Sequence, residues 1–139
     1  MSRKVNQLLV DQVWERANAH CEYCLIAIED TYLGGEIDHI RSLKHGGEST
    51  LENLALACQP CNRYKGTDLG SISDDTDKIV RFYNPRIDRW QEHFELTSGG
   101  RIRGISETGG ITAKIFRFND YERISERLGL MEVGTYPSI

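Results

Sequence analysis

Four cysteines are the first residues of this sequence that could do chemistry together. They form two Cys-x-x-Cys pairs, Cys21/Cys24 in "CEYC" and Cys58/Cys61 in "CQPC". Four thiolates are the number that a closed tetrahedral zinc site requires, and such a site leaves no position open for a reacting water. The pairs therefore predict a structural zinc ion. Two alternatives stay open: four unligated buried cysteines, or a cytosolic redox or zinc-handling protein, although no βαβ pattern surrounds either pair.

A second set of residues lies between and just beyond these pairs. Asp38 is followed by His39, Asn53 comes fourteen residues after the histidine, and Asn62 comes nine residues later. Hydrolysis of a phosphodiester requires a base for the attacking water, and histidine can fill that role near neutral pH. It also requires a hard cation, which prefers oxygen ligands. His39 is therefore the candidate base, and Asp38 and Asn62 are candidate ligands for Mg²⁺ or Mn²⁺.

The same residues resemble the motifs of the HNH endonuclease family. "DHI", "GGESTLENL" and "CQPCNRYKG" match its ββα-metal core piece by piece over roughly residues 18–67, with asparagine in the last motif position as in HNN-type members. The resemblance, to small bacterial or phage members, implies a nuclease that cuts DNA with catalytic residues Asp38, His39, Asn53 and Asn62. It implies that Asn53 ties the long loop to the backbone near the histidine. Three basic residues near the motifs are candidates for phosphate contact: Lys65, Arg63 and Arg41.

The elements that would position these residues can be read from the apolar periodicity. Apolar residues spaced by three and four predict a helix over 5–19, followed by a cysteine knuckle. Short β-like pieces in "DTYLGGEIDHI", punctuated by Gly34 and Gly35, predict a hairpin. "RSLKHGGEST" predicts a loop, and "NLALAC" a strand that leads into a helix near Pro60. We therefore expect an α+β fold in which residues 1–67 form an N-terminal helix and a zinc-braced ββα core.

Residues 68–139 are expected to form a C-terminal α/β extension that packs on this core and contacts substrate. Within it the sequence predicts helical segments in "KIVRFY" and "RIDRWQEHFEL", a hairpin in "RIRGISETGGITA", and a helix in "YERISERLGL" closed by Gly129. "FYNPRIDRWQEHFEL" and "GISETGGIT" are also similar to an extension found in some small bacterial HNH proteins.

Composition narrows the range of partners. The 139 residues carry a net charge of -4, which argues against a protein that coats nucleic acid by bulk electrostatics. No apolar run approaches the length of a membrane span or a signal peptide, so we expect a soluble cytoplasmic protein. DNA is the expected partner, and no small-molecule ligand or membrane is expected. The alternative is a zinc-braced nucleic-acid binding module of HNH ancestry that does not cleave, and the sequence specifies neither target nor oligomeric state.

Overall fold

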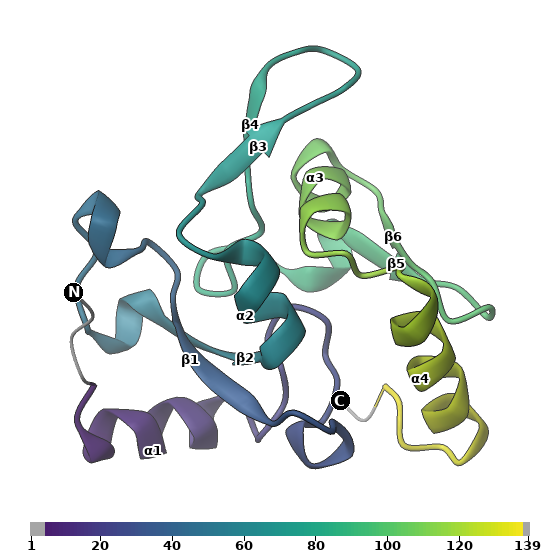
Figure 1. The fold of residues 1–139 in the computed structure, drawn as a ribbon, viewed down its shortest axis with the longest axis horizontal. Helices are drawn as coiled ribbons and strands as arrows, with labels where there is room; N and C mark the ends of the chain where they lie inside the picture. Colours follow the sequence, from purple (N-terminus) through teal and green to yellow (C-terminus); the bar gives the residue numbers. More distant parts are fainter. Residues whose placement is uncertain (1–4, 138–139) are drawn as a thin grey trace.

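Two antiparallel strands followed by a helix form the centre of the computed structural model, which describes residues 5–137. Strand β1 (Gly35–His39) pairs with β2 (Leu54–Cys58), and helix α2 (Gln59–Lys65) follows directly and contacts both strands. Helix α1 (Gln7–Arg16) packs against β2 (Figure 1). The predicted order of helix, strand, loop, strand and helix is confirmed, and so is the α+β class.

The register between β1 and β2 determines which residues lie at each end of this two-stranded sheet. Gly35 lies opposite Cys58 and His39 lies opposite Leu54, so the first residue of β1 is beside the second cysteine pair. All five residues of β2 are buried, which explains its apolar sequence. The expected hairpin around Gly34 and Gly35 is wrong, because β1 pairs with β2, a strand that follows the long loop.

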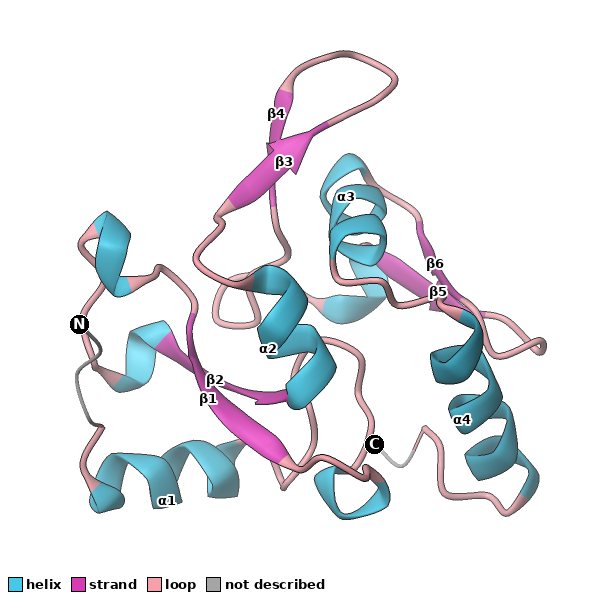
Figure 2. Ribbon diagram, viewed as in Figure 1, coloured by secondary structure: helices cyan, strands magenta, loops and turns pink. Residues whose placement is uncertain are grey.

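The extension adds two further hairpins and two helices (Figure 2). The loop of the first hairpin extends beyond the rest of the chain in this view, while both strands of that hairpin contact the first of the two helices; the second hairpin also lies beside the helices. Among the residues described, no helix is long and apolar enough to cross a membrane. The elements are β3 (Gly70–Ile72), β4 (Ile79–Arg81), β5 (Phe94–Leu96), β6 (Ile102–Gly104), α3 (Glu107–Ile115) and α4 (Tyr121–Glu132).

Three expectations for the extension are wrong. The helix expected in "KIVRFY" is strand β4, and the one expected in "RIDRWQEHFEL" is a single 3₁₀ turn, Trp90–Glu92, followed by β5. The hairpin expected in "RIRGISETGGITA" is the single strand β6 followed by helix α3. Three-residue strands are too short to show an alternating pattern, which explains the first two errors. Helix α4 also continues beyond Gly129, to Glu132.

The third error has a tertiary cause at a glycine. Glycines weaken a helix, yet α3 contains the pair Gly109 and Gly110. A Cβ atom on Gly109 would lie 1.9 Å from the carbonyl oxygen of His93. The backbone of α3 therefore approaches the segment before β5 so closely that only glycine fits.

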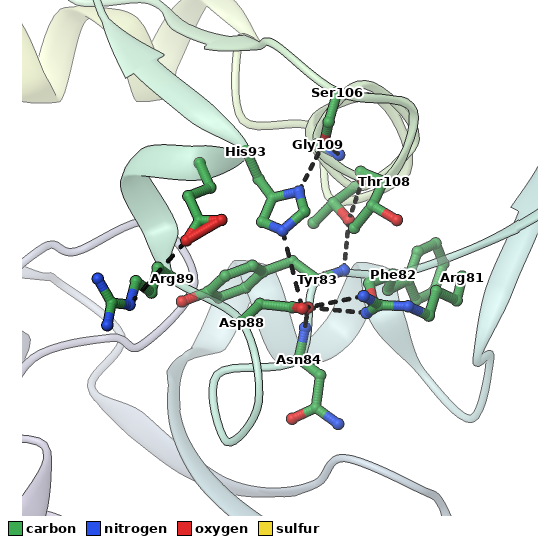
Figure 3. A network of polar contacts seen from close by, with 12 residues as sticks. Arg81, Phe82, Tyr83, Asn84, Asp88, Arg89, His93, Ser106, Thr108 and Gly109 are labelled. Carbon is green, nitrogen blue, oxygen red and sulfur yellow. Dashed lines mark hydrogen bonds and ion pairs between the residues drawn. The ribbon is translucent and has the colours of Figure 1, made fainter.

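A polar network centred on Asp88 holds the extension together (Figure 3). Both guanidinium Nη atoms of Arg81 donate to the Asp88 carboxylate, at 2.7 and 2.9 Å, and the backbone N–H of Asn84 donates to it at 2.9 Å. The bonds from Arg81 hold the pKa of Asp88 below its usual value. His93 lies 3.7 Å from the same carboxylate and shares a 2.6 Å hydrogen bond with Ser106, at the start of α3. The network thus joins β4, the 3₁₀ turn and α3.

An aromatic cluster joins the extension to the cysteine knuckles. The ring of Tyr23, between Cys21 and Cys24, lies 5.1 Å from the ring of Phe116 and 6.4 Å from that of Tyr83. Core strands and extension contribute to one buried hydrophobic cluster. Extension and core therefore bury apolar surface against each other.

Candidate functional site

The four cysteines meet at one buried point. Their Sγ atoms all lie within 4.8 Å of one another, and none of the four residues is more than 2% exposed. The sulfurs of Cys24 and Cys58 are 3.7 Å apart, too far for a disulfide at about 2.05 Å. Four sulfurs bound tetrahedrally at about 2.3 Å from zinc would be separated by about 3.8 Å. The cysteines are therefore positioned to hold a zinc ion.

The pKa values of these thiols agree with a site that is completed by a cation. Burial raises the pKa of the Cys61 thiol well above its usual value, and hydrogen bonding with Cys21 raises the pKa of Cys58. Hydrogen bonding with Cys21 lowers the pKa of Cys24. Without a cation the cluster cannot hold four negative charges in one buried place. A divalent metal would displace the protons, so metal affinity should rise with pH.

Asp38, His39 and Asn62 line one cavity of about 620 Å³. Adjacent residues of a strand point to opposite faces, yet both strand residues reach this cavity. The reason is that His39 is the last residue of β1, where the chain leaves the sheet. Asn62 projects from α2, and its side-chain amide makes no hydrogen bond to any residue in the range 5–137. That amide is free to bind a ligand in the cavity.

Asp38 is the most buried member of the site. It is 3% exposed, with one carboxylate oxygen 3.1 Å from Lys65 Nζ and the other accepting a 2.5 Å hydrogen bond from the Tyr23 hydroxyl. Burial raises the pKa of Asp38, while the ammonium of Lys65 opposes that shift. A carboxylate has about four lone-pair positions, so these two bonds leave capacity for a cation.

His39 is held by a serine of the long loop. Its Nε2 shares a 2.9 Å hydrogen bond with the Ser49 hydroxyl, and Nδ1 has no partner among the described residues. Burial lowers the pKa of His39 below its usual value. This shift favours the neutral imidazole, which retains a lone pair that can accept a proton.

Asn53 fastens the loop that carries Ser49. Its amide donates to the carbonyls of Arg41 at 2.9 Å and Glu48 at 2.8 Å, and its oxygen accepts from the Arg41 N–H at 2.8 Å. A Cβ on Gly47 would lie 1.7 Å from the Arg41 carbonyl oxygen, so only glycine fits where the loop comes back against the backbone of Arg41. These contacts fix the path of the loop next to His39.

The three basic candidates divide into two groups. Arg41 and Arg63 are exposed and can reach a ligand from solvent. Lys65 is 2% exposed, and its Nζ donates to Asp38 and, at 2.9 Å, to the His39 carbonyl. The ammonium of Lys65 is thus committed to the buried carboxylate in this structure, and phosphate contact by Lys65 stays a prediction.

The geometry described above coincides with a match to a known family. Residues 21–68 match the family model described as HNH endonuclease, a range that contains all four cysteines and the lining residues Asp38, His39 and Asn62. This segment is an HNH endonuclease domain. The resemblance stated from the sequence is confirmed over this range. No curated protein matches the chain.

Two residues around the cavity of the HNH domain were missed by sequence reasoning. Tyr23 donates to Asp38 and Ser49 holds His39. A tyrosine inside a cysteine knuckle and a serine in a glycine-bearing loop are ordinary features, so the sequence carried no signal for either. Their contacts depend on how the first knuckle and the long loop fold back over β1.

Proposed function

We propose that the chain is a metal-dependent endonuclease that hydrolyses the phosphodiester bonds of DNA. The observation that carries the proposal is the cavity of the HNH domain, where His39, the buried carboxylate of Asp38 and the amide of Asn62, which has no partner among the described residues, lie together. Such a set can activate a water and bind a cation next to a phosphate.

His39 is the proposed general base. When Nε2 carries the proton and donates to Ser49, Nδ1 presents its lone pair to a water in the cavity. As that water attacks phosphorus, Nδ1 takes its proton. A positioned base of this kind typically contributes about 10²–10⁴-fold to the rate.

Asp38 and Asn62 are the proposed ligands of the catalytic cation, Mg²⁺ or Mn²⁺. Both present oxygen atoms, which suit hard cations, and two protein ligands leave room for waters and a phosphate oxygen. A cation bound there would stabilise the negative charge that develops on the phosphoryl group. Lys65 and Tyr23 hold the Asp38 carboxylate in place toward the cavity.

The cysteine cluster has a structural role in this proposal. All four ligands are buried thiols, so a zinc ion there would have no open position and would act by fixing the two ends of the core. Arg41 and Arg63 are the candidate contacts to the DNA backbone. In this proposal residues 1–67 carry the chemistry and residues 68–139 support it as an extension.

Conversion of supercoiled plasmid to nicked and linear forms tests the proposal. We expect conversion with Mg²⁺ or Mn²⁺, none with EDTA, and none from His39→Ala. His45→Ala is the matched control, because His45 is exposed in the loop that follows β1, and its loss should leave cleavage unchanged. A folded, zinc-loaded protein that binds DNA but never cuts it would instead support the binding module without cleavage activity.

A further inference from the structure

A buried arginine of the C-terminal helix points at the cysteine cluster. Arg123, on α4, places Nη2 3.1 Å from the Sγ of Cys61 and 3.6 Å from that of Cys58. Its other terminal nitrogen donates to the Phe116 carbonyl at 2.8 Å, and the residue is only 9% exposed. These contacts orient the guanidinium toward the second knuckle.

The negative charge of a zinc-loaded cluster explains why the guanidinium of Arg123 lies beside it. A zinc ion with four thiolates carries a net charge of about -2, and burying uncompensated charge is unfavourable. Among residues 5–137, Arg123 forms no ion pair with a carboxylate, so the thiolates of a zinc-loaded cluster would be the anionic groups that it contacts. Each of the two charges would therefore compensate the other.

The extension also contacts the first knuckle. The indole N–H of Trp90 donates to the carbonyl of Tyr23 at 2.8 Å, and the hydroxyl of Tyr136 donates to the carbonyl of Cys24 at 2.7 Å. Both knuckles thus carry hydrogen bonds from residues outside the HNH domain. Hydrogen bonds that hold the extension against the core are therefore made to residues of the cysteine knuckles that form the metal site itself.

We propose that Arg123 is an outer-shell partner of the zinc site and that zinc binding and the docking of α4 stabilise each other. Hydrogen bonds to metal ligands commonly change metal affinity by about 10–100-fold. Because coupling between two equilibria is reciprocal, the loss of Arg123 should weaken zinc binding even though the residue is not a ligand.

Zinc release to an excess of a chromogenic chelator tests this coupling in the full-length protein. Arg123→Met should release zinc about 10–100-fold faster than the parent. Arg127→Met is the matched control: Arg127 is 2% exposed on the same helix, but it donates to the Gly100 and Phe118 carbonyls and to Asn119. The control should lose thermal stability while it releases zinc at close to the parental rate.

Spectroscopy of the cobalt-substituted protein gives an independent readout. Arg123→Met should shift the sulfur-to-cobalt charge-transfer bands, because it removes hydrogen bonds to two of the sulfurs, and Arg127→Met should not. Parental zinc release and unshifted bands in Arg123→Met would overturn the proposal, and so would a parent protein that holds no zinc. If Arg123→Met does not fold, Arg123→Lys and Arg127→Lys decide: faster release in the first alone supports the coupling, and equal release in both overturns it.

Discussion

The buried pair of Lys65 and Asp38 permits a quantitative test of how the HNH domain is built. The two side chains are 2% and 3% exposed. Lys65→Met keeps the apolar stem and removes the ammonium, which leaves the carboxylate of Asp38 buried with Tyr23 as its only remaining side-chain partner among the described residues. Breaking one side of a buried pair typically costs about 3–5 kcal/mol, because the remaining charge stays out of water.

This cost converts into a large change of melting temperature. The entropy of unfolding is about 0.3 kcal/mol/K for a chain of 139 residues. We therefore expect Lys65→Met to melt about 10–17 °C below the parent, measured by circular dichroism with equal zinc content. Lys114→Met is the matched control, because Lys114 pairs with Asp74 on the surface, with side chains 53% and 79% exposed. It should cost at most about 1 kcal/mol.

The deficit of Lys65→Met should also depend on pH. Burial already raises the pKa of Asp38, and loss of the ammonium, which opposes that shift, raises it further. The folded variant then binds a proton that the unfolded chain releases near its lower, unperturbed pKa, so its stability falls as pH rises between the two values. The difference from the parent should thus shrink as the pH falls toward the unperturbed pKa of the carboxyl group. A variant that melts within a few degrees of the control, or whose deficit does not change with pH, would refute this reasoning.

Three further predictions concern other parts of the molecule. Cleavage should rise as His39 loses its proton, through a pKa below its usual value of about 6.5, and then stay level at higher pH; a pH–rate profile with its midpoint above about 7 would argue against this base. Cys58→Ser should lower both bound zinc, measured by elemental analysis, and melting temperature; a full zinc complement with parental melting would exclude a structural metal. Asp88→Asn should cost about 1–3 kcal/mol at neutral pH, seen in urea unfolding, because Arg81 loses its charged acceptor; an unchanged midpoint would show that the network is dispensable.

Sequence reasoning succeeded where the determining contacts are local. The two cysteine pairs and the order of strand, loop, strand and helix lie within one short stretch, and residue types at fixed spacing were enough to predict them. It failed in the extension, where three-residue strands carry no period and where Gly109 is set by its close approach to His93. A glycine required by packing and a glycine that ends a helix look the same in one sequence.

The sequence by itself determined the chemistry available to this protein: four thiols for a metal, and a histidine, a carboxylate and an amide within one segment. Only the tertiary structure decided how those groups are held. Lys65, a candidate for phosphate contact from the sequence, pairs with Asp38 inside, and Arg123, sixty-two residues after Cys61, reaches the cysteine cluster. The physical reason is that a buried charge must find an opposite charge or a hydrogen-bond partner, and folding supplies that partner from anywhere along the chain.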